Sequence, residues 1–232
     1  MNHIGIIGAM EEEVKCLKDK LVLSEVVKKA SMEFYQGTLN GKDIVVVQSG
    51  IGKVNAAICA QILVDDFQVE AIINTGIAGG LVNHVEIGDI VISKDVLHHD
   101  MDATGFGYEV GVIPRMDTSI FEADTTLAEL AKQVCEKVNT DISAHIGRIV
   151  TGDQFISSKE RKTWLLDTFH GFCAEMEGAA IAQVAHVNHL PFLIVRAISD
   201  KADNSACEDY PKFEKKAIEH AVRLVEGMLE KL

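Results

Sequence analysis

The sequence predicts an α/β protein in which a single domain spans residues 1–232 and a central, mixed, twisted sheet is flanked by helices. Short apolar runs with the length of buried strands alternate with longer segments of helical periodicity. Apolar residues make up 47% of the chain, which is enough for a large core. Only 3 prolines occur and no Ser/Gly-rich or single-charge tract forms a linker, so no domain boundary is expected.

The first half of the chain predicts strands, a hairpin and two helices. A buried strand at residues 4–7 precedes the acidic run 11–13, which suits a first helical turn because acidic side chains complement the helix dipole. Residues 33–39 and 43–48 are expected to pair around Asn40-Gly41, a strong turn signal. The remaining elements expected here are a helix from 54 to about 64 and strands at 71–74 and from 88 toward His98.

The second half of the chain continues the alternation. Helices are expected at residues 123–138, 158–167, 177–187 and 208–232, and strands at 144–151, 172–176 and 191–200. Ser158 is the expected N-cap of its helix. Residues 103–116 are predicted to be irregular. The rings of Phe106, Tyr108 and Pro114 on this segment suggest burial against another surface, such as a second subunit.

Composition excludes several classes of protein. The net charge of −13 and the pI near 5.1 argue against nucleic acid and anionic membranes as partners, because an acidic surface offers them no opposite charge. No apolar stretch reaches membrane-spanning length, and the N-terminus does not have the pattern of a signal peptide. The 5 cysteines are odd in number, scattered and never in a C-x-x-C pair, which favours reduced core residues in a cytoplasmic protein.

Three motifs resemble ligand sites without matching them. Gly50-Ile51-Gly52-Lys53 fails the P-loop pattern, because Val47 and Val54 occupy required positions, so a tight strand-to-helix turn is the better interpretation. The glycines of residues 75–80 suit either close approach to a flat ligand or a turn, and their spacing does not predict a nicotinamide cofactor. His98 and His99 point to opposite faces of a strand, so no metal site is expected from them.

Four acidic residues lie where strands end or helices begin: Glu13, Glu175, Glu177 and Asp200. Carboxylates are seldom buried without a task or a partner. Glycosidic chemistry is one such task, in which one acid protonates the leaving group and another activates water, while a further carboxylate can hold sugar hydroxyls. Asp200 follows a covered strand, which would raise its pKa and suit proton donation, or it caps a turn or pairs with Arg196. Glu175 and Glu177 share a face only if their strand continues past both.

Seven segments carry a family resemblance, in order and from end to end: GIIGAMEEEV, SGIGKVNAA, NTGIAGG, EIGDIV, GDQFI, AEMEGAAIA and VRAISDKAD. They resemble the bacterial 5′-methylthioadenosine/S-adenosylhomocysteine nucleosidases of the purine nucleoside phosphorylase superfamily. The resemblance implies a nucleoside phosphorylase-like fold and a cytoplasmic homodimer without metal or cofactor. It also implies hydrolysis of the N-glycosidic bond of both nucleosides, with 5′-deoxyadenosine as a further expected substrate.

The resemblance also implies roles for individual residues. Glu13 would activate water, Asp200 would protonate the purine with support from Ser199, and Glu177 would bind the ribose hydroxyls. The sugar and adenine are expected beside Met176, Arg196, Ala78, Gly79, Phe155 and Ile156. The 5′-thio group is expected in a pocket formed by Met10, Ile51 and Phe213 and closed by Phe106 and Pro114 of the partner subunit.

Some residues depart from the family pattern, and other functions compete with nucleoside hydrolysis. Ile77 and Tyr210-Pro211 differ from the commonest family pattern. The related phosphorylases resemble this chain but carry Arg where Asn74 stands and lack an acid matching Glu13. The Glu13 carboxylate would repel phosphate, so hydrolysis is preferred over cleavage by phosphate. A non-catalytic nucleoside binder would have lost at least one of the three acids, and all three are present. The ranking of methylthioadenosine against futalosine-type substrates stays open.

Overall fold

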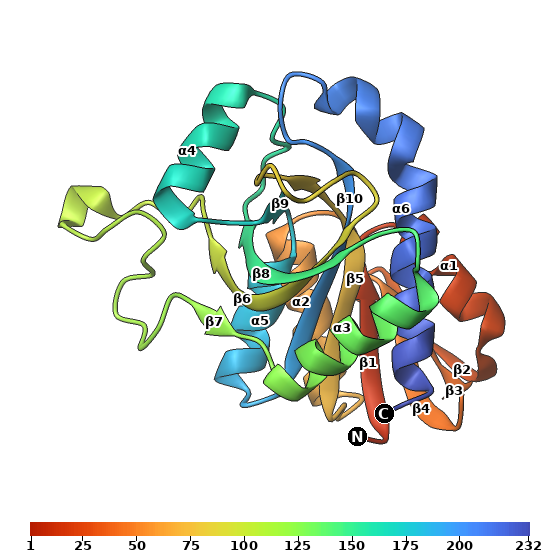
Figure 1. The fold of residues 1–232 in the computed structure, drawn as a ribbon. Helices are drawn as coiled ribbons and strands as arrows, with labels where there is room; N and C mark the ends of the chain where they lie inside the picture. The colour runs from red at the N-terminus through yellow and green to blue at the C-terminus, as the bar shows by residue number, and fades with distance from the viewer.

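Strands and helices alternate along the chain as predicted, and the computed structural model describes all 232 residues (Figure 1). The strands are β1 (His3–Gly8), β2 (Val22–Lys29), β3 (Met32–Leu39), β4 (Lys42–Gln48), β5 (Ala71–Gly80), β6 (Ile90–His98), β7 (Phe121–Glu122), β8 (Ala144–Thr151), β9 (Cys173–Glu175) and β10 (Phe192–Asp200). The helices are α1 (Glu11–Lys20), α2 (Lys53–Asp65), α3 (Thr125–Val138), α4 (Lys159–Phe169), α5 (Gly178–Val187) and α6 (Ala206–Leu229), with a 3-10 turn, η1 (Thr104–Phe106).

The ten strands form one mixed sheet, and five of them close into a ring. β2, β3 and β4 are antiparallel, and β4, β1, β5 and β10 continue as parallel neighbours. β10 then pairs antiparallel with β6, β6 and β8 run parallel, β8 and β9 run parallel, and β9 returns antiparallel to the end of β5. Because β5 pairs with β1, β9 and β10, the ends of β5, β9 and β10 meet at one mouth of this ring.

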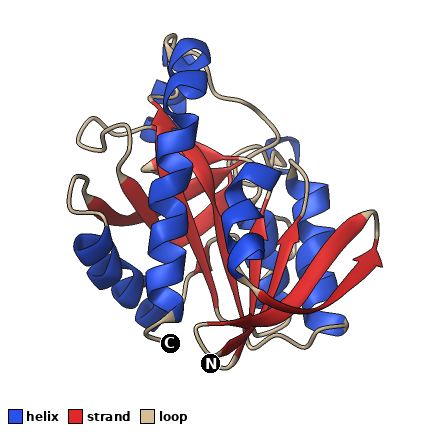
Figure 2. Cartoon of the chain, turned by 90° about the vertical axis from the view of Figure 1, so that its right-hand side faces the viewer, coloured by secondary structure: helices blue, strands red, loops and turns tan.

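Helices cover both faces of the sheet, which explains why the strands are apolar on both sides (Figure 2). α1, α3 and α6 share one core with Ile4 and Ile6 of β1, while α2 and α5 share the other with Ile7. Gly5 faces α2, where an added Cβ would lie 2.8 Å from Leu63. None of the helices combines the length and apolar character that a membrane crossing requires. The predicted α/β class with a mixed sheet is confirmed.

Two local predictions differ from the structure. Residues 75–80, expected to form a turn or a glycine loop, continue strand β5, because β10 and β9 supply hydrogen-bonding partners to its last residues. Strand β2 was not predicted. It lies at the edge of the sheet and exposes Val22, Leu23 and Val26, so its sequence lacks the apolar alternation of a half-buried strand.

Candidate active site

A cavity of about 520 Å³ opens at the mouth of the strand ring, which is the size of a small-molecule site. Eleven of its 18 lining residues are hydrophobic. The predicted site residues that line it are Met10, Glu13, Ile51, Ala78, Gly79, Phe155, Ile156, Met176, Glu177, Ser199 and Asp200. They come from six separate stretches of the chain, so the fold gathers most of the predicted site in one place.

Four predicted site residues lie outside the lining of this cavity. Arg196 is fully buried behind it, and Phe213 is partly exposed on α6. Phe106 and Pro114 lie on the segment between β6 and β7, which projects from the body of the molecule (left of Figure 1). Phe106 is 87% exposed there.

Glu13 is turned inward by helix capping. It is the third residue of α1, and its Oε2 accepts hydrogen bonds from the backbone N–H groups of Ala9 (2.7 Å) and Met10 (2.9 Å), which have no partner inside the helix. Glu11 and Glu12 stay exposed. Oε1 of Glu13 accepts from Ile77 N at 3.2 Å. Burial raises the pKa of Glu13 against the opposing effects of the Arg196 charge and these N–H groups.

Gly76 makes room for this carboxylate. A Cβ at residue 76 would lie 2.7 Å from Glu13 Oε1, closer than real Cβ contacts. The glycine run that closes β5 therefore serves close approach by a side chain of the protein itself, in addition to any approach by a ligand.

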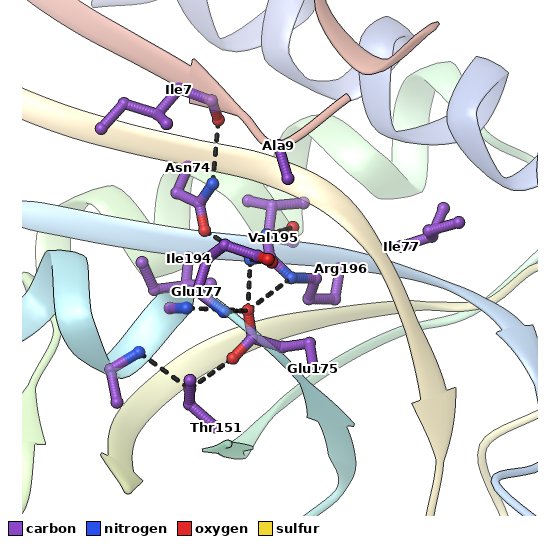
Figure 3. Close-up of polar contacts among 12 residues, drawn as sticks. Ile7, Ala9, Asn74, Ile77, Thr151, Glu175, Glu177, Ile194, Val195 and Arg196 are labelled. Carbon is purple, nitrogen blue, oxygen red and sulfur yellow. Dashed lines mark hydrogen bonds and ion pairs between the residues drawn. The ribbon is translucent and has the colours of Figure 1, made fainter. Parts of the chain in front are cut away.

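Glu175 lines the cavity and is the centre of a buried polar network, although no role was predicted for it (Figure 3). Its Oε2 lies 2.5 Å from Arg196 Nη2 and accepts Gly178 N–H at 2.8 Å, while Oε1 accepts the hydroxyl of Thr151. Burial would raise the pKa of Glu175, but the Arg196 charge and these donors hold it below the ordinary value. Arg196 also donates to Asn74 Oδ1, and Asn74 donates to the carbonyl of Ile7.

Glu177 lies between the end of β9 and the start of α5, and its backbone N–H donates to Glu175 Oε2 at 3.1 Å. Its Oε1 accepts Gly52 N–H at 2.8 Å, and its Oε2 lies 4.0 Å from Arg196 Nη2. Burial first, and then the neighbouring Glu175 carboxylate, raise the pKa of Glu177 to about 7. The strand ends at Glu175 and the helix begins only after Glu177, so neither of the two arrangements left open by the sequence is observed, and both acids line the cavity.

Asp200 ends β10 and accepts two hydrogen bonds, from Ser199 Oγ (2.9 Å) and Ala202 N–H (2.8 Å). It therefore caps the turn that follows the strand and also lines the cavity. It does not pair with Arg196, whose charge is taken by Glu175. Burial raises the pKa of Asp200, and the two hydrogen bonds oppose this only in part.

Tyr210 forms part of the cavity wall, although it was not predicted as a site residue. Its ring meets Phe155 edge-on with centroids 6.0 Å apart, and its hydroxyl donates to Glu214 Oε1 at 3.0 Å. α6 begins at Ala206, two residues earlier than predicted, and Cys207 and Tyr210 lie three residues apart on the face toward the cavity. Phe213, three residues further along α6, is exposed and lies outside the cavity lining.

The histidine cluster at the end of β6 is not arranged as a metal centre. His98 Nε2 lies 3.0 Å from Gln183 Oε1, whereas the His99 ring lies against Gly152. No group of three or more His, Cys, Asp or Glu side chains is placed to hold a metal ion.

The fold and this acid-lined cavity define a member of the phosphorylase superfamily, whose family model matches residues 3–230. A 5′-methylthioadenosine/S-adenosylhomocysteine nucleosidase of Staphylococcus haemolyticus is 44% identical over 99% of this chain and 100% of its own length. The chain therefore belongs to the family of 5′-methylthioadenosine/S-adenosylhomocysteine nucleosidases.

Two solved structures extend the comparison. The nucleosidase of Neisseria meningitidis in complex with methylthio-immucillin-A has a TM-score of 0.95 and 36% identity, with 100% of both chains covered. A futalosine hydrolase of Helicobacter pylori has a TM-score of 0.94 and 32% identity, over 100% of this chain and 98% of that one.

Proposed function

We propose that this protein hydrolyses the N-glycosidic bond of 5′-methylthioadenosine and S-adenosylhomocysteine, releasing adenine and the 5-thioribose product. The observation that carries this proposal is the convergence of Glu13, Glu177 and Asp200 on one largely apolar cavity. Family membership supports the substrate class. 5′-Deoxyadenosine has the same adenosine part and is a further substrate of this reaction.

Glu13 acts as the base that positions and deprotonates the attacking water. Its carboxylate is held by three backbone N–H groups, so it is fixed in orientation before water binds. Burial raises its pKa, which makes the ionised form a stronger base than a solvated glutamate. Because Ile77 lies beside it in the cavity wall, the water has few competing polar partners on that side.

Asp200 donates a proton to the five-membered-ring nitrogen of adenine, which turns a poor leaving group into a neutral one. Its raised pKa keeps the acid form populated closer to neutral pH. Ser199 and Ala202 fix the carboxyl group. Adenine lies between Phe155 and the ends of β5 and β10, where backbone groups of Ala78 and Gly79 reach its edge.

Glu177 holds the ribose hydroxyls beside Met176. One carboxylate oxygen is occupied by Gly52 N–H, which leaves the other for the sugar. Hydrogen bonds to the ribose hydroxyls support the sugar as it gains oxocarbenium character. Arg196 is not itself a lining residue of the cavity, so in this proposal it acts on the sugar only through Glu175 and Glu177.

Water is preferred over phosphate as the nucleophile. Bound phosphate requires cationic donors, and the cationic side chain nearest the acids, Arg196, is fully buried and paired with Glu175. Asn74, at the place of the phosphorylase arginine, is engaged with Ile7 and Arg196. The Glu13 carboxylate would repel an anion at that end of the cavity.

The protein acts as a homodimer in the cytoplasm. The segment that carries Phe106 and Pro114 projects from the body and leaves Phe106 uncovered, which suits contact with a second copy. In the dimer, Phe106 and Pro114 of the partner subunit close the pocket for the 5′-thio group beside Met10 and Ile51. All five cysteines are free, which supports a reducing compartment.

Adenine release in phosphate-free buffer tests this function. The purified protein should release adenine from 5′-methylthioadenosine without phosphate, and the rate should not rise when phosphate is added. A strict phosphate requirement would make the protein a phosphorylase. Values of kcat/KM over a panel with S-adenosylhomocysteine, 5′-deoxyadenosine and a futalosine-type nucleoside would rank the substrates.

A further inference from the structure

Hydrogen bonds join the loop Gly50–Lys53 to the residues that follow β6, beside the active site. Lys53 Nζ donates to Asp100 Oδ1 at 2.6 Å, and the second carboxylate oxygen of Asp100 accepts Asp153 N–H at 3.0 Å. Asp153 Oδ1 in turn accepts Lys53 N–H at 2.8 Å. Lys53 is the first residue of α2, whereas Asp100 and Asp153 lie in the connections that follow β6 and β8, so the contacts join three separate segments.

The start of α2 binds carboxylates of the protein itself. Gly52 N–H donates to Glu177, and the next N–H, of Lys53, donates to Asp153. Free N–H groups at a helix start favour negative charge, which is the property that phosphate loops use. Here both donors are occupied and the Lys53 ammonium is neutralised by Asp100, so the loop is not available to a phosphate group.

The local geometry of Gly52 depends on this arrangement. Gly52 has φ of 97°, a left-handed conformation that directs its N–H to Glu177. A Cβ at residue 52 would lie 3.1 Å from Asp153 Oδ1, so the two groups are in close contact. The Asp100–Lys53 pair is largely shielded, with side chains 15% and 23% exposed, so solvent screens it less than a surface pair.

From these contacts we infer that Asp100, Lys53 and Asp153 form a clamp that positions Gly52 N–H against Glu177 and thereby orients Glu177 toward the ribose. The three residues are positioning residues, because none of them lines the cavity. This inference rests on the proposed function for its effect on catalysis. The clamp itself is a property of the fold and has a readout without substrate.

Two variants loosen the clamp at different points. Lys53→Met removes the ammonium, and Asp153→Ala removes the acceptor of Lys53 N–H, while Asp153 N–H still reaches Asp100 in both. The backbone at Asp153, on the adenine side of the cavity, therefore stays hydrogen-bonded to Asp100. We expect kcat/KM for 5′-methylthioadenosine to fall about 10- to 100-fold, as for other small losses of alignment. The Kd of free adenine, which has no ribose, should stay within about twofold. Asp153→Asn keeps a carbonyl acceptor and should restore most of the activity.

A matched control is Asp95→Asn. Arg148 Nε lies 2.6 Å from Asp95, with the side chains 26% and 7% exposed, and this pair also joins β6 to β8. It does not contact α2 or the cavity, so its loss should leave kcat/KM unchanged. Unchanged kcat/KM in both Lys53→Met and Asp153→Ala would overturn the clamp. Equal losses in kcat/KM and adenine affinity would also overturn it, because they would indicate general loosening.

Amide hydrogen exchange separates this inference from the proposed function. Gly52 N–H should be protected in the wild type and exchange at least about tenfold faster in Lys53→Met and Asp153→Ala. If the wild type released no adenine, the proposed function would fail, while this exchange result would still support the clamp. Equal protection of Gly52 in wild type and both variants would refute the clamp whatever the activity.

Discussion

Arg196 and Glu175 form an ion pair in the interior of the protein, with Nη2 and Oε2 2.5 Å apart and both side chains 2% exposed. The pair lies directly behind Glu177, to which Arg196 comes within 4.0 Å. The buried charges are tolerated because Thr151 and Gly178 donate hydrogen bonds to Glu175, and Asn74 Oδ1 accepts one from Arg196. The active site is therefore supported by a charge pair that solvent does not reach.

Breaking this pair should unfold the protein more easily. Arg196→Met leaves Glu175 buried and unpaired, so we expect the free energy of unfolding to fall by about 3–5 kcal/mol. Combining it with Glu175→Gln should cost less than the sum of the two single variants, because no charge is then left alone. Urea denaturation measures all three. Lys20→Met, which breaks the exposed pair with Glu226, should cost less than about 1 kcal/mol. Strict additivity would contradict the coupling.

Glu13→Gln should abolish turnover and keep ligand binding. The amide cannot take a proton from water, so kcat should fall by about 10²- to 10⁴-fold. The Kd of adenine should remain near that of the wild type, because in the proposed function Glu13 contacts the attacking water and not adenine. Glu12→Gln, one residue earlier and exposed, is the control and should behave as wild type. Comparable kcat values for Glu13→Gln and wild type would remove Glu13 from the mechanism.

Asp200→Asn should slow cleavage by an amount that depends on whether the leaving group needs a proton. With 5′-methylthioadenosine, the loss of the proton donor should lower kcat by about 10²- to 10⁴-fold. A 5-methylthioriboside of 4-nitrophenol, whose leaving group departs without protonation, should lose far less. Steady-state kinetics on both substrates gives the ratio. An equal loss on the two would show that Asp200 acts on structure and not as an acid.

The pH dependence of stability should carry the signature of Glu177. Burial favours its neutral form in the folded state, so its pKa rises from 4.5 to about 7. Between these values the unfolded chain ionises first and binds fewer protons, so stability falls as pH rises through this window. Glu177→Gln removes the effect and should flatten the curve by about 1–3 kcal/mol between pH 4.5 and pH 7. Parallel curves for wild type and variant would exclude the raised pKa.

Phe106→Ala should affect substrates according to their 5′ group. If the partner's Phe106 covers the thio substituent, its loss removes apolar burial worth about 25 cal/mol per Å². KM for 5′-methylthioadenosine should then rise several-fold, while KM for adenosine, with a 5′-hydroxyl, should change little. Ile120→Ala, exposed on the same segment, is the control. Equal changes for the two substrates would place Phe106 away from that pocket.

Much of the fold could be predicted because apolar runs and turn signals act locally. The hairpin around Asn40-Gly41 and the Ser158 cap are both present. The extension of β5 through its glycines could not be predicted, because it depends on pairing with β9 and β10, which are about 100 residues away in sequence. Edge strand β2 was missed because its side chains are exposed on both faces.

The candidate site was predictable where a residue type and a resemblance agree, as for Glu13 and Asp200, which line one cavity. The partner of Arg196 was not predictable. The sequence suggested only Asp200, which follows Arg196 in the same strand, whereas the three-dimensional approach of Glu175 supplies the actual partner. Tyr210 was not predicted to line the cavity, because the side of α6 that faces the cavity is set by how the helix packs against the sheet and not by the helical pattern alone.

The closed ring of five strands separates the acids proposed to break the bond from the residues proposed to select the substrate. Glu177 follows β9 and Asp200 ends β10, and both strands are bonded on both sides, whereas Phe155, Tyr210 and Phe106 belong to connections and a helix outside the ring. Under the proposed function, we expect substitutions in these outer parts to change which nucleosides are admitted and to leave the bond-breaking groups in register. Substrate range in this protein can therefore diverge through its periphery while the chemistry at its centre is inherited unchanged.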